Sequence, residues 1–279
     1  MREFFKKFTP GFLKPILRNI YVQMLDLMDW LRGRDSMLPP RSMIFVGGGD
    51  FVAIGQEFKN YFIDLAGMQP YHRVLEVGCG IGRMAIPLTA YLIPEGAYFG
   101  FDAVTKGINW CSKHISSKYG NFHFLHCDIY NKLYNKNGKI PAKDYQFPYD
   151  NGSFDFIFLT SVFTHMLPAD VEHYMGEISR VLKIGGKCLI TFYILNAESQ
   201  NLIHTRRSNL DFRYKINDCF TIDENEPETA IAYEQEYTRK LFGKCGLSIN
   251  EPVYYGSWCK REKYLSYQDI IIASKEKMN

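Results

Sequence analysis

Three glycines separated by single residues follow a short apolar run in the first third of the chain. The segment reads Glu76-Val77-Gly78-Cys79-Gly80-Ile81-Gly82. Glycines allow a tight turn and let a ligand approach the backbone where a Cβ would block it. The dinucleotide-binding pattern GxGxxG would need glycine at position 83, where this chain has Arg83. Glu76 would also repel a pyrophosphate, so the turn favours a cationic or neutral ligand.

Two more carboxylates follow β-rich runs further along the chain. Asp102 and Asp128 each stand at the end of such a run. The carboxyl ends of parallel strands meet at one edge of a sheet, where α/β proteins bind ligands. Asp102 can accept hydrogen bonds from both ribose hydroxyls, and Asp128 can bind an adenine amino group with Ile129 beside it. With Glu76, these residues predict a site for a phosphate-free adenosine that carries positive charge.

The elements that must position these residues alternate between strands and helices. We expect strands at 74–77, 98–101, 122–126, 154–159 and 187–193, with closing strands at 247–255 and 267–274. Apolar spacing predicts helices at 16–31, 55–66, 82–92, 105–118, 168–183 and 233–244. This alternation indicates an α/β protein with a doubly wound, mostly parallel sheet that is covered on both faces.

Five blocks of the chain resemble class I S-adenosylmethionine-dependent methyltransferases in order and spacing. The blocks are VLEVGCGIGRMAIPL (74–88), YFGFD (98–102), HFLHCDI (123–129), FDFIFLTSVFTHM (154–166) and EISRVLKIGGKCLITFY (177–193). The resemblance covers roughly 70–195. It implies a Rossmann-like sheet of seven strands with the last strand antiparallel, and S-adenosylmethionine as the cofactor.

The resemblance also implies roles for individual residues. Asp102 would hold the ribose, Asp128 and Ile129 the adenine, and the glycine turn the methionine portion. Thr160 and Ser161 would lie beside the sulfonium, although they could instead cap the next segment, as Asp128 could cap a helix. The full expected cofactor-binding set is Glu76, Gly78, Cys79, Gly80, Gly82, Asp102, Ala103, Asp128, Ile129, Thr160 and Ser161. Within it, Cys79 is expected to pack rather than react.

Methyl transfer to a hydroxyl needs a group that removes the hydroxyl proton. Positioning of the nucleophile supplies much of the acceleration, and a general base adds to it. His165 follows the strand 154–159 and is the best-placed candidate base, since a histidine is largely neutral at pH 7. It could instead hold the loop. His204 is a weaker candidate, and no spacing of Asp, Glu or His indicates a metal.

Substrate contacts are expected outside the five blocks. The loop 44–54 and the long segment 196–232 are the expected lid and pocket walls. Candidate contacts, each of which could instead be a core or surface residue, are Phe51, Arg206, Phe212, Tyr214 and Trp258.

The expected acceptor is a small molecule methylated at a hydroxyl group. The Asn/Asp-Pro-Pro-Tyr type of signature for amino-group methylation is absent after the fourth strand, where the chain reads LTSVFTHM. Polyketide, glycoside and lipid-linked acceptors remain open. Alternatives are methylation of a small molecule at carbon or nitrogen, an inactive binding subunit with the same fold, and a NAD-dependent oxidoreductase.

Composition and charge agree with a packed enzyme that does not bind nucleic acid. The chain has 279 residues, of which 46% are hydrophobic and 23% charged, and its net charge is +3. Residues 1–34 contain seven Lys or Arg and three Asp or Glu, so they carry +4 and the rest carries −1. Seven cysteines without a CxxC pair predict reduced thiols and a cytoplasmic protein.

The first 34 residues suggest a separate role. They are basic, rich in phenylalanine, and include an amphipathic helix that could lie on an anionic membrane surface. The same helix could instead pack on the catalytic domain or form a dimer contact, and the oligomeric state stays open. We therefore divide the chain into an N-terminal helical extension, 1–60, and a methyltransferase domain, 61–279, with an insertion at 196–232.

Overall fold

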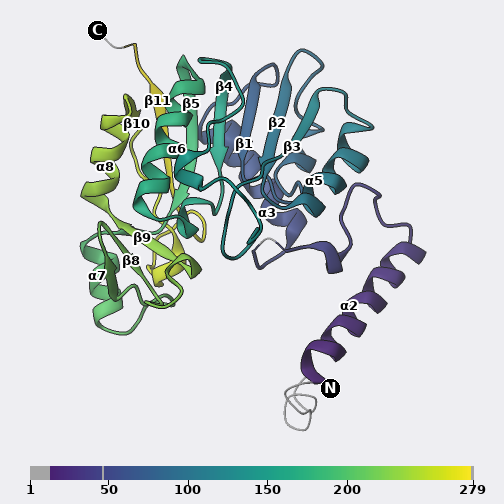
Figure 1. Ribbon diagram of the computed structural model, residues 1–279, viewed down its shortest axis with the longest axis horizontal. Helices are drawn as coiled ribbons and strands as arrows, with labels where there is room; N and C mark the ends of the chain where they lie inside the picture. The colour runs from purple at the N-terminus through teal and green to yellow at the C-terminus, as the bar shows by residue number, and fades with distance from the viewer. Residues whose placement is uncertain (1–12, 46, 278–279) are drawn as a thin grey trace.

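A seven-stranded sheet forms the centre of the molecule in the computed structural model, which describes residues 13–45 and 47–277 (Figure 1). Its strands are β1 (Arg73–Val77), β2 (Ala97–Asp102), β3 (Phe122–His126), β4 (Phe154–Leu159), β5 (Leu182–Phe192), β10 (Leu247–Ile249) and β11 (Asp269–Lys275). The strand order is β10-β11-β5-β4-β1-β2-β3, and β11 runs antiparallel to both of its neighbours. The prediction of a mostly parallel, doubly wound sheet of seven strands is confirmed.

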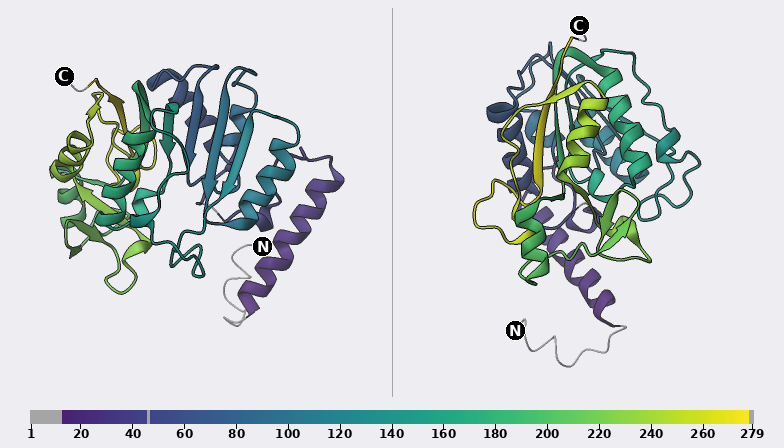
Figure 2. Two further views of the ribbon diagram at one scale, coloured as in Figure 1. Left: turned by 45° about the horizontal axis from the view of Figure 1, so that its top comes forward. Right: turned by 90° about the vertical axis from the view of Figure 1, so that its left-hand side faces the viewer.

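Both faces of this sheet are buried under helices (Figure 2). Successive side chains of a strand point to opposite faces, so Leu75 joins one apolar cluster and Val74 the other. The first cluster includes side chains of α6 (Pro168–Val181) and α8 (Gln235–Lys244). The second includes side chains of α3 (Phe51–Asn60), η2 (Tyr61–Leu65), α4 (Ala85–Leu88), α5 (Thr105–Cys111) and η3 (Ser112–Ser116).

Several helices differ from the expected ranges for local reasons. The helix expected at 82–92 shrinks to α4, because the residues before Ala85 form turns. α3 begins at Phe51 rather than residue 55, since Asp50 caps it by accepting hydrogen bonds of 2.9 Å from the N–H groups of Val52 and Ala53. α3 continues directly into η2, so the domain boundary expected at residue 60 falls inside one helical run.

The expected insertion, 196–232, contains α7 (Ala197–His204), β7 (Tyr214–Ile216), β8 (Cys219–Thr221) and η6 (Pro227–Thr229). With β6 (Ile194–Leu195) and β9 (Ile231–Glu234), it builds a second sheet in the order β6-β9-β8-β7. This small sheet has its own apolar cluster, which includes Phe212 and Trp258. The long connection is thus a packed subdomain rather than an open loop.

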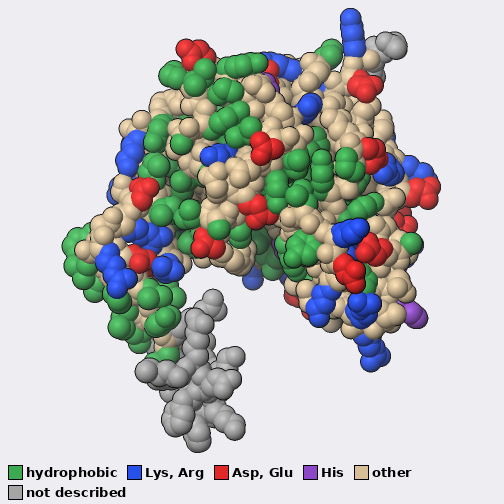
Figure 3. Space-filling view, turned by 180° about the vertical axis from the view of Figure 1, so that it is seen from behind, with side chains coloured by type: hydrophobic (Ala, Val, Ile, Leu, Met, Phe, Trp, Pro, Cys, Tyr) green, Lys and Arg blue, Asp and Glu red, His purple; other side chains and the backbone are tan. Residues whose placement is uncertain are grey.

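The helix α2 (Leu13–Leu31) projects away from the body of the molecule (Figures 1 and 2). Its Asp26 accepts hydrogen bonds from the N–H groups of Arg41 (2.6 Å) and Ser42 (3.1 Å) in η1 (Arg41–Met43). Many apolar side chains of α2 are exposed, as the space-filling view shows (Figure 3). Among residues 13–45 and 47–277, no helix has the length and apolar character needed to cross a bilayer.

Candidate active site

A cavity of roughly 360 Å³ opens at the carboxyl edge of the large sheet, where β1, β2 and β4 end. The structure brings ten of the expected site residues together in its wall: Glu76, Gly78, Cys79, Gly80, Asp102, Ala103, Ile129, Thr160, Ser161 and His165. Two expected cofactor-binding residues, Gly82 and Asp128, are not part of this wall.

The first two glycines of the turn serve the cavity, and the third serves packing. Gly78 and Gly80 have φ values of +77° and +56°, which side chains rarely adopt. A Cβ on Gly78 would come within 2.6 Å of Val162 Cγ2 in the opposite wall. A Cβ on Gly82 would instead lie 3.0 Å from both Cys111 Sγ and Ile115 Cδ1, so this glycine lets the turn approach α5 and η3.

Asp102 is held in place by the backbone around it. Its Oδ2 accepts a hydrogen bond of 2.7 Å from the N–H of Gly80, and its Oδ1 accepts one of 2.8 Å from the N–H of Val104. Burial raises the pKa of Asp102 above its ordinary value, against the hydrogen bonds, which lower it. The carboxylate oxygens retain further lone pairs that can accept hydrogen bonds from a ligand.

Glu76 and Arg83 form the charged end of the cavity. Glu76 is only 2% exposed and accepts a hydrogen bond from the hydroxyl of Tyr98. Burial raises the pKa of Glu76 to about 8. Arg83 lines the same cavity, and its buried Nε has no hydrogen-bond partner in the described part of the chain. Burial lowers the pKa of Arg83, while the nearby Glu76 raises it.

Cys79 behaves as a packed residue. Its side chain is 3% exposed, and burial raises the pKa of its thiol well above the usual range. A thiol that stays protonated is a poor nucleophile. The expectation that Cys79 packs rather than reacts agrees with this environment.

The loop after β4 is fixed by a side chain of β5 and by one that directly precedes β11. Ser161 has a φ of +62°, an uncommon conformation for a residue with a side chain. Its N–H donates a hydrogen bond of 2.8 Å to Thr191 Oγ1, and its Oγ lies 2.9 Å from Gln268 Nε2. Strained residues of this kind cluster at functional sites. The loop therefore presents Thr160 and Ser161 to the cavity in one defined geometry.

His165 ends η5 (Phe163–His165) and lines the cavity. Its Nδ1 lies 2.8 Å from the carbonyl oxygen of Glu228 in the small sheet's connecting segment. Burial lowers the pKa of His165 below its ordinary value, although hydrogen bonds to the backbone at Glu228 and Thr229 oppose this. The ring of Tyr134 meets the imidazole edge-on, with the centroids 6.3 Å apart.

Comparison with known proteins identifies the family of this chain. A sequence profile described as a methyltransferase domain matches residues 69–241, which is more than half of the chain. The chain belongs to this methyltransferase family. This family is of the class I type, and its cofactor is S-adenosylmethionine.

Solved structures share the fold of the methyltransferase at low sequence identity. The PH0226 protein of Pyrococcus horikoshii matches with a TM-score of 0.56 and 13% identity, over 84% of this chain and 95% of that one. A SAM-dependent methyltransferase of Methanosarcina mazei matches with a TM-score of 0.50 and 20% identity, over 79% of this chain and 97% of that one. Magnesium protoporphyrin IX methyltransferase of Synechocystis was solved with bound S-adenosylhomocysteine. It matches with a TM-score of 0.51 and 14% identity, over 93% of this chain and 100% of that one.

A curated relative acts on RNA. The methyltransferase is 26% identical over 197 residues to the chicken tRNA N(3)-cytidine methyltransferase METTL2. The match covers 69% of this chain and 47% of the relative. The chain therefore spans about half the length of that protein.

The cavity residues fit the cofactor that the family uses. An acidic and a basic side chain at one end suit the ammonium and carboxylate of its amino acid portion, and Glu76 and Arg83 lie there. In the same wall, Asp102 offers carboxylate oxygens and Ile129 an apolar surface. Asp128 does not reach the wall; its carbonyl accepts hydrogen bonds of 3.0 Å from the N–H groups of Lys139 and Ile140.

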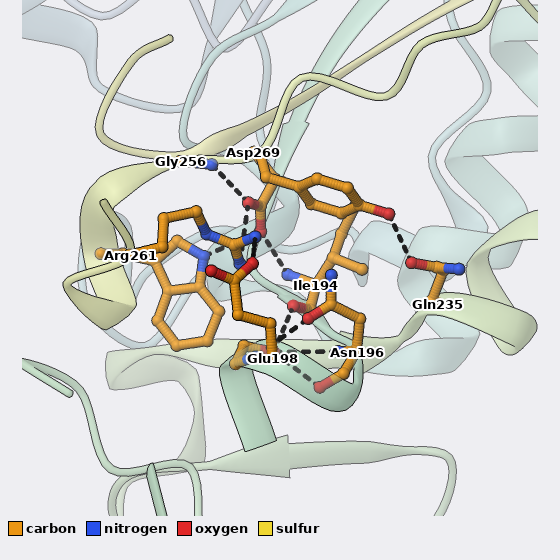
Figure 4. A network of polar contacts seen from close by, with 10 residues as sticks. Ile194, Asn196, Glu198, Gln235, Gly256, Arg261 and Asp269 are labelled. Carbon is orange, nitrogen blue, oxygen red and sulfur yellow. Dashed lines mark hydrogen bonds and ion pairs between the residues drawn. The ribbon is translucent and has the colours of Figure 1, made fainter. Parts of the chain in front are cut away.

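The five expected substrate contacts and His204 lie outside the cavity wall of the methyltransferase. Trp258 is fully buried and donates a hydrogen bond of 2.8 Å to Asp269 Oδ2. Asp269 belongs to the polar network of Figure 4. Phe212 packs on Trp258 in the core of the small sheet. Phe51 is the first residue of α3, and His204 is the last residue of α7. Arg206 and Tyr214 are exposed residues of the small-sheet region.

Sequence reasoning missed several residues of the wall. They are mostly aromatic or apolar, and only Arg83, Met84 and Met166 belong to the five blocks: Phe45, Arg83, Met84, Val104, Tyr130, Asn131, Tyr134, Met166 and Tyr174. Arg83 had a signal, because it directly follows the glycine turn. Phe45 and Gly47 come from the loop 44–54, which the sequence did suggest as a wall.

Proposed function

We propose that this methyltransferase transfers the methyl group of S-adenosylmethionine to a hydroxyl group of a small molecule, with His165 as general base. The observation that carries the proposal is the contact of 2.8 Å between His165 Nδ1 and the Glu228 carbonyl oxygen. A carbonyl oxygen only accepts hydrogen bonds, so Nδ1 carries the proton and Nε2 keeps a free lone pair. Because burial lowers the pKa of His165, the ring is neutral at pH 7 and can accept a proton.

The proposed reaction is an in-line displacement. The bound cofactor supplies a methyl group activated by its positively charged sulfur. His165 Nε2 would accept the hydroxyl proton while the acceptor oxygen would bond to the methyl carbon, and the electron pair of the broken carbon–sulfur bond would stay on sulfur. Thr160 and Ser161, in the loop fixed by Thr191 and Gln268, supply the rigid wall beside the reacting atoms.

Each end of the cofactor has proposed partners among the wall residues. Glu76 would bind the ammonium group and Arg83 the carboxylate of the methionine portion, since these side chains share one end of the cavity. Asp102 would accept hydrogen bonds from the ribose hydroxyls, and Ile129 would pack on the adenine. Gly78 and Gly80 line the cavity without side chains, so a ligand can approach their backbone closely.

The size and lining of the cavity favour a small acceptor. A cavity of roughly 360 Å³ lies near the lower end of the range for small-molecule sites and must also hold the cofactor, so it leaves little space for the acceptor. Its wall is rich in aromatic and apolar side chains, such as Phe45, Tyr134, Met166 and Tyr174. The near-neutral charge outside residues 1–34 also argues against a polyanionic acceptor.

Cofactor binding is the first test. Calorimetry should show that S-adenosylhomocysteine binds the protein and that Asp102→Ala weakens binding by about 100-fold, because two hydrogen bonds to a charged group are lost. The control is Asp64→Ala, an exposed aspartate outside the cavity, which should bind normally. Absence of binding to the folded protein would refute the enzyme proposal and favour an inactive subunit with the same fold.

The acceptor is tested with a labelled methyl group on the cofactor. Label should enter a metabolite fraction rather than tRNA, and mass analysis should place it on oxygen. Label in tRNA would favour the activity of the chicken relative. Label on a carbon or nitrogen atom of a metabolite would identify a C- or N-methyltransferase of small molecules and overturn the assignment to a hydroxyl group.

The base is tested with the same labelled cofactor. His165→Gln should lower kcat by about 10²–10⁴-fold, because the hydroxyl proton then has no positioned acceptor. His204→Gln, which replaces an exposed histidine outside the cavity, is the matched control. Equal kcat values for the two variants would remove His165 as the base.

A further inference from the structure

The helix α2 exposes a continuous apolar stripe along its length (Figure 3). The stripe consists of side chains that recur every three or four residues, with an adjacent pair at 27 and 28, and each is between 41% and 69% exposed: Leu17, Ile20, Met24, Leu27, Met28 and Leu31. Residues at this spacing share one side of a helix. Soluble proteins rarely leave such a contiguous apolar surface open unless it meets a partner.

Polar contacts on the other side of α2 hold the stripe away from the body. Asp26 lies about 200° around the helix from Met24, and its Oδ2 accepts a hydrogen bond of 2.7 Å from Ser42 Oγ. Asp29 pairs with Arg41 Nε at 3.0 Å and with Arg34 Nη1 at 3.4 Å. The polar side of the helix is therefore tied to the following segment, and the apolar stripe is left facing outward.

The charge next to the stripe indicates what covers it. The first 18 residues contain five basic side chains, Arg2, Lys6, Lys7, Lys14 and Arg18, against one acid, Glu3. This net +4 complements an anionic surface, whereas a second copy of the chain would bring the same cations to the contact. Tyr21 lies about 60° around the helix from Met24 and is 57% exposed, and such a side chain is typical of the membrane–water interface.

We propose that the apolar stripe docks the methyltransferase on the surface of an anionic lipid bilayer. α2 would lie in the interface rather than cross it, since its apolar residues form a stripe and Asp26 and Asp29 occupy the other side. The chain runs from α2 through η1 to Phe45 and Gly47, which line the cavity. Docking would thus place the cavity near the bilayer surface. This inference rests on α2 and does not depend on the proposed acceptor.

Vesicle cosedimentation of the full chain tests the proposal. Vesicles of equal parts phosphatidylglycerol and phosphatidylcholine should bind the protein, vesicles of phosphatidylcholine alone should bind it far less, and salt should weaken binding. The double variant Met24→Gln and Leu27→Gln keeps the charge but removes two apolar side chains of the stripe. It should lower the vesicle affinity by about 100-fold.

The matched control removes two apolar side chains that are equally exposed elsewhere. Tyr71 and Ile184 are 57% and 64% exposed, and their double replacement by Gln should leave vesicle binding unchanged. The proposal would be overturned if both double variants lost the same vesicle affinity, or if the full chain did not bind vesicles. A dimer that depends on the stripe in sedimentation equilibrium, without vesicle binding, would also overturn it. Calorimetry of the same variants with S-adenosylhomocysteine shows that they are folded and tests the active-site proposal separately.

Discussion

Glu76 and Arg83 are two buried ionisable residues that share one end of the cavity. In the described structure they form no ion pair within 4.0 Å: Glu76 accepts a hydrogen bond from Tyr98, and Arg83 Nε has no partner. Burying a polar group without a partner costs free energy, so natural proteins rarely retain such an arrangement without a use. A zwitterionic ligand would give each residue an opposite charge, and this explains why the pair stands at a cavity wall.

Replacement of Arg83 by Met should weaken binding of the amino acid portion of the cofactor without affecting binding of the adenosine portion. S-adenosylhomocysteine should bind roughly 10–100-fold more weakly, because a charged hydrogen bond to its carboxylate is lost. 5′-Methylthioadenosine lacks the amino acid portion, so its affinity should not change. Calorimetry with both ligands measures this, and Arg83→Lys should recover part of the loss. An equal loss for both ligands would show that Arg83 supports the fold and not the carboxylate.

Ligand affinity should also depend on pH through Glu76. Since burial raises the pKa of Glu76 to about 8, the free protein holds a proton there that an incoming ammonium group must displace. The affinity for S-adenosylhomocysteine should therefore rise by about tenfold per pH unit as pH increases toward 8, and then level off. Calorimetry from pH 6 to pH 8 checks the slope. Glu76→Gln should bind with a flat profile, and an unchanged slope in this variant would assign the proton to another group.

The same pKa shift acts on folding stability. The unfolded chain releases the Glu76 proton near the ordinary value of 4.5, whereas the folded chain keeps it up to about 8. The folded state binds more protons than the unfolded state between these two pH values. The contribution of protonated Glu76 to folding stability is therefore complete below pH 4.5 and is lost as the pH rises toward 8. Cofactor binding, which favours ionised Glu76, has the opposite dependence.

At the scale of elements, the sequence was most informative about the strands of the central sheet. The expected ranges 122–126 and 154–159 coincide with β3 and β4, because their apolar runs are bounded by turn residues. The small sheet was not predicted, since strands of two to four residues carry little periodicity. One local signal existed: Asn217, with a φ of +50°, stands in the two-residue turn between β7 and β8.

The incorrect placement of Trp258 has the same origin. An aromatic residue far from any motif could line a pocket or fill a core, and only the small sheet decides between them. Its apolar cluster buries Trp258 and Phe212 together. Beneath this cluster, Asp269 accepts hydrogen bonds of 2.6 Å from the N–H groups of Ile194 and Gly256 (Figure 4). Asp269 therefore links β11 to the start of the small sheet.

Asp269→Ala should destabilise the fold by about 3–5 kcal/mol. The change leaves three buried donors without an acceptor and removes the carboxylate 3.9 Å from Arg261 Nη2, whose side chain is 1% exposed. Urea unfolding measures the loss. Trp258→Phe removes one of these hydrogen bonds and should cost less, about 1–2 kcal/mol. If the two variants were equally stable, the carboxylate would not be the centre of the network.

At the scale of the whole molecule, the sequence located the parts of the site that lie within one contiguous stretch. Asp102, Thr160 and His165 follow strands of one sheet, and parallel strands bring their carboxyl ends together whatever the rest of the chain does. Phe45 and Tyr134 reach the cavity from irregular segments whose paths depend on tertiary packing. No local pattern encodes such paths, so these residues became apparent only in the structure.

The orientation of α2 relative to the body should depend on Asp26. Burial alone would raise the pKa of this carboxyl, but hydrogen bonds from Ser42 and Arg41 and the charge of Arg34 lower it overall. The Asp26 carboxylate therefore contributes fully to the stability of the folded protein at pH values above its ordinary pKa of 3.8. This contribution is lost as the pH falls through the lower pKa of the folded protein. At neutral pH, Asp26→Ala should weaken the association of α2 with η1 by about 1–2 kcal/mol. The effect is no larger because the carboxylate is partly exposed.

Hydrogen exchange can resolve this effect because it reports on each segment separately. In Asp26→Ala, the amides of Arg41 and Ser42 should exchange faster, whereas β1 and β4 should keep their protection. The matched control is Asp35→Ala, an exposed aspartate in the same connecting segment whose side chain accepts a hydrogen bond from the Met37 N–H. Unchanged exchange at Arg41 and Ser42 in Asp26→Ala would mean that other contacts orient α2. Faster exchange there, with unchanged exchange in Asp35→Ala, would show that the Asp26 carboxylate holds η1 against α2.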